Sequence, residues 1–185
     1  MHRSLRNRLL AALCGCVLLA PAAHGQAPKG NARCSTAQQA QFDFWLGEWT
    51  GTEKGVRDGQ LKTLSTTHVT ASKILDGCAL LELNEVDAGE VAFKSVTVRA
   101  FDNQKGTWML HYTDNINNTF QVWEGAQVDG KWRFSTERVI EGSKVLVRLS
   151  WTVASKDQVT WQIERSTDNG ATWTPRSTIE FTRKK

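Results

Sequence analysis

The chain has few of the residues from which proteins build metal and redox centres. It contains four histidines and four cysteines in 185 residues, and beyond residue 25 only His68, His111, Cys34 and Cys78 remain. None of the cysteines forms a C-x-x-C pair, and a zinc site needs three or four converging ligands. The sequence therefore argues against a dithiol redox motif and against a zinc site.

Motifs of common catalytic chemistry are also missing. No nucleophile motif, phosphate-binding loop or pair of carboxylates is recognisable. Four glutamates are expected on the outer faces of strands, as solvated charges: Glu82, Glu124, Glu137 and Glu180. An enzyme of the cyclase or isomerase type, using Tyr112, His68 or an arginine inside the fold, is an alternative that rests on fold analogy alone.

No run of one charge is left once the N-terminal segment is set apart. Residues 1–25 hold Arg3, Arg6 and Arg8 and no acidic residue, so the net charge of +4 falls to +1 for the remainder. Nucleic acid and anionic membrane surfaces are therefore unexpected partners. Nothing in the pattern indicates an oligomeric state.

The first 25 residues resemble a secretory signal peptide. The three arginines precede an uncharged apolar run over residues 9–20, and small residues at 23–25 offer a cleavage point before Gln26. The run is shorter than the roughly 20 residues of a membrane-spanning helix. We predict export to the periplasm or the medium. Lipoprotein processing at Cys16 is the alternative, disfavoured because the apolar stretch continues beyond it.

The rest of the chain is predicted to be one domain. Residues 26–34 form a polar leader, and residues 35–185 form the fold. Ser35 resembles the N-cap of a single short helix over 36–45, which Gly47 ends. From residue 48 onward, turn residues recur at regular intervals and separate about ten strands. This pattern predicts an all-β antiparallel meander, which closes into a barrel because closure removes exposed strand edges.

Side-chain alternation predicts how neighbouring strands pair. The hairpin over residues 102–106 is expected to pair Ala100 with Trp108, Val98 with Leu110 and Val96 with Tyr112. Two later hairpins pair Trp132 with Trp151 and Trp151 with Trp161, which gives three strands one inner face. The opposite face sets Arg148 across from Glu164 as an ion pair.

Cys34 and Cys78 are predicted to form a disulfide, since two cysteines in an exported chain usually pair. The bridge would close a loop of about 44 residues and contribute roughly 4 kcal/mol in the chain-entropy model. Two free thiols are the alternative.

The segment FDFWLGEW at residues 42–49 resembles the opening of a bacterial family of uncharacterised exported domains of the calycin type. Its Gly47-Glu48-Trp49 is a G-x-W, as on the first strand of lipocalins, and nitrobindin-like haem barrels share a similar start more distantly. The resemblance implies a calycin or lipocalin-like barrel over residues 42–183 and no established activity. By analogy with lipocalins, Arg183 is expected to pack on Trp49.

The segment STDNGATW at residues 166–173 resembles an Asp-box. In sialidases this motif is a folded hairpin turn remote from the chemistry. Asp168 and Asn169 are expected to accept hydrogen bonds from turn amides, while Gly170 adopts positive φ and Trp173 packs beneath. We interpret the motif as structural.

The predicted registers place two arginines on the inner face, Arg138 and Arg165, with Gln121 and Trp123 from the preceding strand. A buried guanidinium needs a compensating group, either a protein carboxylate or an acidic group of a ligand. Together with Tyr112, these residues indicate a site for a small, mainly apolar ligand that carries an acidic group.

No cofactor is identified from the sequence. Haem would need His68 inside the barrel, where its register is ambiguous, whereas His111 is expected outside opposite Thr97. A barrel filled solid by its eight tryptophans, serving as a structural or interaction domain, is a further alternative.

Overall fold

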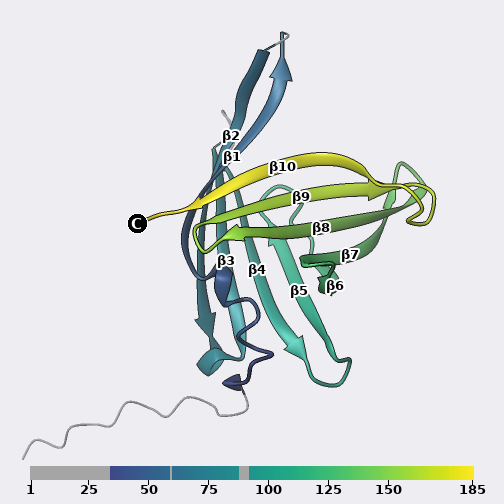
Figure 1. Ribbon diagram of the computed structural model, residues 1–185. Helices are drawn as coiled ribbons and strands as arrows, with labels where there is room; N and C mark the ends of the chain where they lie inside the picture. The colour runs from purple at the N-terminus through teal and green to yellow at the C-terminus, as the bar shows by residue number, and fades with distance from the viewer. Residues whose placement is uncertain (1–33, 59, 88–91) are drawn as a thin grey trace, which may run out of the picture.

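The computed structural model describes residues 34–58, 60–87 and 92–185, and it shows a closed barrel of ten antiparallel strands (Figure 1). Each strand pairs with the next along the chain, and the first pairs with the last. The strands are β1 (Gly47–Arg57), β2 (Gln60–Ile74), β3 (Ala79–Asp87), β4 (Phe93–Asp102), β5 (Thr107–Asp114), β6 (Gln121–Val128), β7 (Lys131–Ile140), β8 (Ser143–Ser155), β9 (Gln158–Ser166) and β10 (Thr174–Arg183). The predicted all-β meander is thus confirmed. The predicted signal peptide and most of the polar leader lie outside the described residues.

The inner face of β7, β8 and β9 follows the predicted registers. Trp132 pairs with Trp151, and Trp151 pairs with Trp161. The β7–β8 turn consists of Glu141 and Gly142, both with positive φ, which suits the right-handed twist of a two-residue hairpin. On the outer face Arg148 donates to Glu164 at 2.9 Å. The turn chemistry and the side-chain alternation therefore agree along these three strands.

The register between β4 and β5 differs from the prediction by one residue. Phe101 pairs with Trp108, Arg99 with Leu110 and Thr97 with Tyr112. The loop holds four residues, 103–106, because the amide of Gly106 donates to the Asp102 carbonyl at 2.8 Å with φ of +69°. The prediction used a loop one residue shorter. The shift brings Arg99 and Thr97 to the inner face in place of Val98 and Val96.

The predicted N-terminal helix is replaced by a chain of tight turns that ends in a short 3-10 helix, η2 (Asp43–Trp45). Most of its backbone hydrogen bonds run from residue i+3 to residue i, as from Asp43 to Ala40. Gln39, Phe42 and Trp45 are buried at intervals of three, which matches three residues per turn. A second 3-10 helix, η3 (Leu75–Gly77), joins β2 to β3. Within the described residues, no helix is long and apolar enough to cross a membrane.

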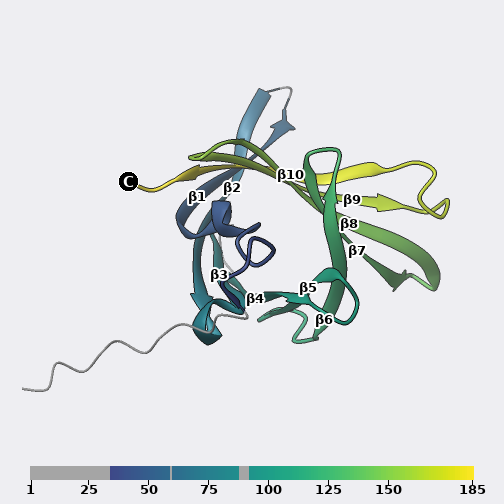
Figure 2. The same cartoon turned by 60° about the horizontal axis from the view of Figure 1, so that its bottom comes forward.

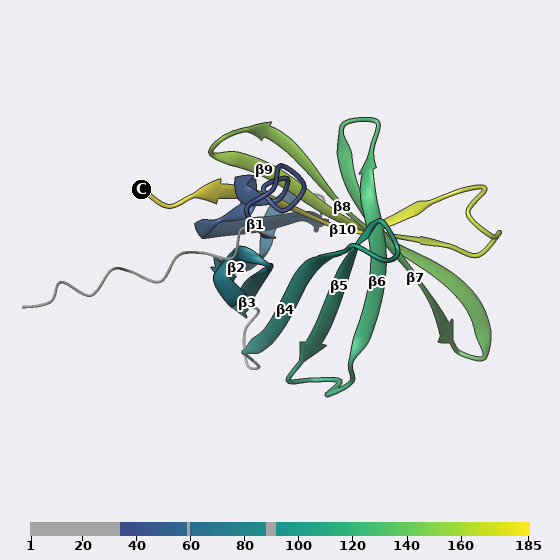
Figure 3. The ribbon, with the colours of Figure 1, turned by 90° about the horizontal axis from the view of Figure 1, so that it is seen from below.

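The N-terminal segment closes one end of the barrel. Figure 2 shows it inside the ring of strands, and its Phe42 and Trp45 side chains are both buried, at 1% exposure. The Phe42 ring lies 4.6 Å from that of Trp132 and 5.4 Å from that of Trp108, measured between centroids. We call residues 34–46 the plug. The turns after β7 and β9 extend together away from the plugged end (Figure 3).

The plug is held where β1 and β10 meet. Trp49 pairs with Arg183, whose guanidinium carbon lies 4.1 Å from the centre of the indole, as the likeness to lipocalins implies. Arg183 also donates to the carbonyls of Phe44, at 2.7 Å, and of Leu46. One guanidinium therefore satisfies backbone acceptors at the end of the plug while covering the first tryptophan of the barrel.

The predicted disulfide is present between Cys34 and Cys78, whose Cα atoms lie 4.6 Å apart. It ties the start of the plug to the turn between β2 and β3. The plug makes few ladder hydrogen bonds of its own. The disulfide restricts the conformations that the plug can adopt in the unfolded chain.

Replacing both cysteines, Cys34→Ser with Cys78→Ser, should lower stability by roughly 4 kcal/mol, since the bridge closes a loop of 44 residues. For a domain of this size the melting temperature should fall by about 10 °C. Thermal unfolding followed by circular dichroism measures this shift. Wild-type protein reduced with a phosphine is the control and should melt with the variant. An unchanged melting temperature would contradict the stabilising role.

The turn between β9 and β10 folds around Asp168. Its carboxylate accepts hydrogen bonds from the Ser166 hydroxyl at 2.7 Å, the Thr172 amide at 2.9 Å and the Thr172 hydroxyl at 2.6 Å. These bonds lower the pKa of Asp168 to about 2. Gly170 has φ of +90°, and the Trp173 indole donates to its carbonyl at 3.0 Å. The motif thus acts as a turn.

The lowered pKa of Asp168 predicts an acid-dependent contribution to stability. Its folded-state pKa of about 2 lies below the ordinary 3.8, so the contribution is present above pH 4 and disappears as the pH falls towards 2. Asp168→Asn should therefore melt below wild type at pH 7, and the two melting temperatures should converge near pH 2. A carboxyl titration followed by NMR provides the direct measurement. A midpoint near 3.8 would refute the assignment.

Candidate functional site

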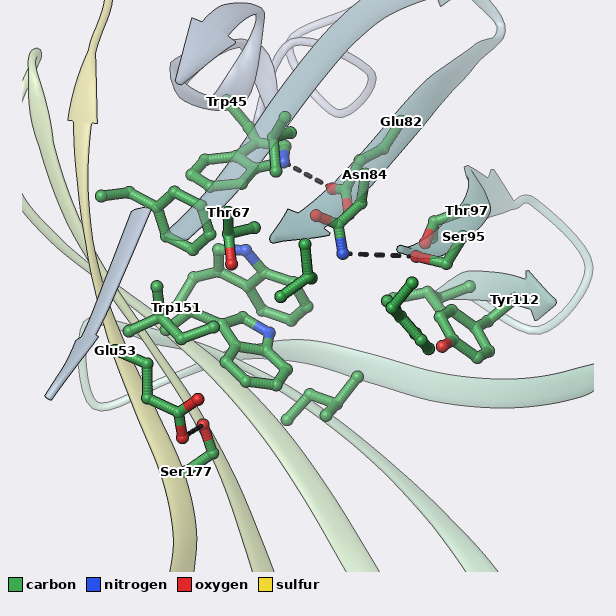
Figure 4. Close-up of a pocket in the computed structure, with 18 of the residues that line it drawn as sticks. Trp45, Glu53, Thr67, Glu82, Asn84, Ser95, Thr97, Tyr112, Trp151 and Ser177 are labelled. Atoms are coloured by element: carbon green, nitrogen blue, oxygen red, sulfur yellow. Dashed lines mark hydrogen bonds between the residues drawn. The ribbon is translucent and has the colours of Figure 1, made fainter. Parts of the chain in front are cut away.

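The barrel encloses a cavity of about 250 Å³ between the plug and the opposite end (Figure 4). That volume corresponds to roughly eight water molecules in the liquid. Its apolar wall includes Val69, Leu110, Leu149, Trp151, Trp161, Ile179 and Phe181. Its polar groups include Glu53, Ser65, Thr67, Asn84, Ser95, Thr97, Tyr112 and Ser177. The barrel is therefore hollow and does not match the alternative of a solid core.

A buried charged network lies at the floor of the cavity. Arg99 Nη1 is 2.8 Å from Glu82 Oε2, and the indole N–H of Trp45 donates to the same oxygen at 2.6 Å. The Arg99 side chain is 1% exposed, and that of Glu82 is 11% exposed. The network joins the plug to β3 and β4, so the position of the floor depends on the ion pair.

Aromatic rings surround the Arg99 guanidinium. Its central carbon lies 5.2 Å from the centre of the Phe42 ring and 4.8 Å from that of Trp151. These contacts supply cation–π attraction where water is excluded. Glu82 was predicted to lie on an outer face, and that prediction is wrong. It faces inward because Arg99, placed inside by the four-residue loop, compensates its charge.

Several buried polar atoms of the cavity wall have no protein partner among the described residues. They include the Thr67 hydroxyl and the indole nitrogen of Trp151, on side chains 1% and 2% exposed. The side-chain oxygen of Asn84 is a third, although its amide nitrogen donates to Ser95 at 3.3 Å. Buried groups of this kind are normally satisfied by ordered water or a ligand. The cavity wall thus offers both donors and acceptors.

Glu53 stands on β1 between two serine hydroxyls. Ser65 of β2 donates to one carboxylate oxygen at 3.0 Å, and Ser177 of β10 donates to the other at 2.7 Å. The β1–β2 ladder shifts register directly after Glu53, and the β9–β10 ladder shifts directly before Ser177. Such bulges re-aim side chains. Glu53 makes no ion pair with any residue that the structure describes.

Of the residues predicted for the site, Tyr112 lines the cavity. Burial raises the pKa of its phenol well above the ordinary value, and a hydrogen bond to Asp114 adds to this effect. The neutral phenol is therefore a donor or acceptor for a bound group and not a base. Asp114 accepts from the amides of Asn117 at 2.6 Å and Ile116 at 2.9 Å. Burial opposes ionisation of Asp114, but these bonds hold its pKa below the ordinary range.

Arg138, Gln121 and Trp123 do come together, outside the set of residues that line the cavity. Arg138 donates to the side-chain amide oxygen Oε1 of Gln121, and its guanidinium lies 5.1 Å from the centre of the Trp123 ring. Burial lowers the pKa of Arg138, and the nearby charge of Arg165 lowers it further, while Asp114 opposes the change. The cluster lies next to Tyr112, on the side away from the plug.

Arg165 pairs with Val147 on β8, as predicted, and its Nε has no hydrogen-bond partner among the described residues. Neither Arg138 nor Arg165 makes an ion pair within the described part of the chain. Two guanidinium groups and one carboxylate, Asp114, therefore leave positive charge at this end of the barrel.

His68 lies on the outer face, exposed and paired with Glu85, while Val69 points inward. The prediction left this register open, and the structure excludes His68 from the cavity. His111 is also exposed, opposite Val98 and not Thr97. Among the residues that the structure describes, no histidine lines the cavity, so its lining does not fit a histidine-ligated haem. No group of metal-ligating side chains occurs among the described residues.

Sequence reasoning missed Glu53, Glu82 and Arg99. The turn Asp102–Gly106 contained the signal for Arg99, because a four-residue loop ending in glycine brings the odd-numbered positions of β4 inward. No local signal marked Glu53. Its environment is made by β2 and β10, which lie 12 and 124 residues away along the chain at Ser65 and Ser177.

Fold and cavity together define a hollow antiparallel barrel closed at one end by its own N-terminal segment. Residues 35–183 match the family described as "Protein of unknown function (DUF1579)", and the chain belongs to this family. No curated protein matches the chain.

Solved structures that are similar to the chain include the following two. S-type phycobiliprotein lyase CPES from Guillardia theta is 14% identical, with a TM-score of 0.50 over 82% of this chain and 94% of that one. Rv2717c from M. tuberculosis is 11% identical, with a TM-score of 0.53 over 80% of this chain and 99% of that one. At these identities the likeness shows the barrel fold alone.

The ion pair at the floor gives a test of its energetic role. Glu82→Leu should cost about 3–5 kcal/mol, because Arg99 would be left buried without a counter-charge. Adding Arg99→Met should recover much of that loss, since both charges are then gone. Urea unfolding of the two single variants and the double variant closes the cycle. Strictly additive losses would show that the two side chains do not interact.

Proposed function

We propose that this protein is an exported barrel that binds a small, mainly apolar molecule carrying an acidic group. The observation that supports it best is the hollow interior, with apolar walls and buried polar atoms of Thr67 and Trp151 that lack protein partners. Its volume of about 250 Å³ lies just below the roughly 300–1,000 Å³ range of ligand pockets. A compact ligand is therefore expected, on the scale of a medium-length acyl chain or a single ring.

The two arginines near Tyr112 support the acidic group. Arg138 and Arg165 have no carboxylate at ion-pair distance among the described residues, and burial disfavours the charge of Arg138. A ligand carboxylate or phosphate would compensate that charge through hydrogen bonds of the charge-assisted kind. The apolar part of the molecule would then extend past Tyr112 into the cavity.

Export agrees with this role, because the signal-like N-terminus and the disulfide both belong to an oxidising compartment. The likeness in fold to a phycobiliprotein lyase supports the barrel and does not specify the ligand. Native mass spectrometry of the protein purified from its own host is the first experiment. A small molecule released on denaturation would identify the ligand class.

The arginine assignment predicts a measurable loss. The double variant Arg138→Leu with Arg165→Leu should bind octanoate at least tenfold more weakly than wild type, because each charge-assisted contact contributes about 1.5–3 kcal/mol. Binding to octanol should change little. Quenching of the cavity tryptophans, which include Trp151 and Trp161, reports both affinities.

Arg133→Leu is the matched control. Arg133 lies on β7, as Arg138 does, but it forms an ion pair with Asp129 instead of facing the interior. It should bind octanoate as wild type does. Circular dichroism and melting curves confirm that each variant is folded. Equal octanoate affinity in the double variant and wild type would refute the assignment of the acidic group.

A further inference from the structure

We propose that Glu53, oriented by Ser65 and Ser177, is a second anchor in the cavity and binds a protonated amine of the ligand. The inference rests on the proposed binding function and adds a group that the arginines do not address. Glu53 is a half-buried carboxylate that lines an otherwise largely apolar wall. A charge in that position is stabilised when a cation shares its desolvated surroundings.

The two serines account for only part of the capacity of this carboxylate. Each oxygen accepts one serine hydroxyl, at 3.0 Å and 2.7 Å. A carboxylate has about four lone-pair sites, so two remain for another donor. Both hydroxyls donate to Glu53, and this fixes the plane of the carboxylate; Figure 4 shows the bond from Ser177. The arrangement therefore preorganises an acceptor for a donor group on a ligand.

Glu82, the other carboxylate that lines the cavity, differs from Glu53 because it already has a counter-charge. Glu82 has Arg99 at 2.8 Å and the Trp45 indole at 2.6 Å, so its charge is already compensated. Glu53 has hydroxyl donors and no cation within the described chain. Among the cations on a small apolar molecule, an ammonium supplies both the missing charge and directed N–H donors.

Backbone irregularity around Glu53 points to the same conclusion. Two ladders in this region shift register, β1–β2 directly after Glu53 and β9–β10 directly before Ser177, whereas the β1–β10 ladder that joins Glu53 to β10 runs without a shift. Bulges commonly re-aim side chains at binding sites, and here they frame the three side chains of the anchor.

Three probes with the same eight-carbon chain separate the two anchors: octylamine, octanol and octanoate. Wild-type protein should bind octylamine about tenfold more tightly than octanol, because a charge-assisted hydrogen bond replaces a neutral one. Glu53→Gln should remove this preference. It should leave octanoate affinity unchanged or raised, since a negative charge has been taken from the cavity wall.

Glu180→Gln is the matched control, because it removes one negative charge from the exposed face of the neighbouring strand β10. It should retain the octylamine preference. Ser177→Ala should reduce the preference by a smaller factor than Glu53→Gln, as one orienting donor is lost. Titration calorimetry gives the affinities, and melting curves show that the variants are folded.

The outcomes separate this inference from the binding function itself. If the ratio of octylamine affinity to octanol affinity is the same in wild type and Glu53→Gln, the amine anchor is overturned. Binding of octanol and octanoate would in that case still support the proposed function. Failure of all three probes to bind would overturn the proposed function and the anchor together. Loss of octylamine preference in Glu53→Gln alone, with Glu180→Gln unchanged, is the supporting result.

Discussion

The structure depends on one buried ion pair, Arg99 with Glu82, and on the aromatic rings that enclose it. A guanidinium at 1% exposure is stable inside a small barrel only if its charge is compensated. Here the partners come from three elements, because Trp45 of the plug donates to Glu82 of β3, and Phe42 covers Arg99 of β4. The pair therefore connects the N-terminal segment to the wall and defines where the filled part of the barrel ends.

The position of that floor leaves the remainder of the interior open. Below it, Phe42 packs with Trp108, Trp132 and Trp151 in a dense aromatic cluster. Above it, the inward positions carry hydroxyls, an amide and a carboxylate, which do not pack into a dry core. The same strands thus serve as core at one end and as cavity wall at the other. The inward residues of the strands therefore differ between the packed end and the cavity end of the barrel.

Charge is distributed unevenly around the open part. Arg138 and Arg165 leave positive charge on the β7 and β9 side, while Glu53 leaves negative charge on the β1 side. Arg138 is held by a neutral hydrogen-bonding group, the side-chain amide of Gln121, and Glu53 is held by two serine hydroxyls. Neutral supports orient a charged side chain without cancelling its charge, which keeps it available to a charged group from outside.

The sequence by itself determined the barrel, the disulfide, the contact of Arg183 with Trp49 and the registers of β7, β8 and β9. The barrel, the disulfide and these registers follow from turn residues, alternation and one pair of cysteines, whereas the contact of Arg183 with Trp49 is what the resemblance to lipocalins implied. Only the tertiary structure decided the inward faces of β3 and β4, the outward position of His68 and the placement of Glu53 between Ser65 and Ser177. A change of one residue in the length of a loop exchanges the inner and outer faces of the strand beside it. The local sequence does not say which face points inward when one of the two carries a charged residue. That preference depends on compensating partners which the closed barrel brings from distant strands.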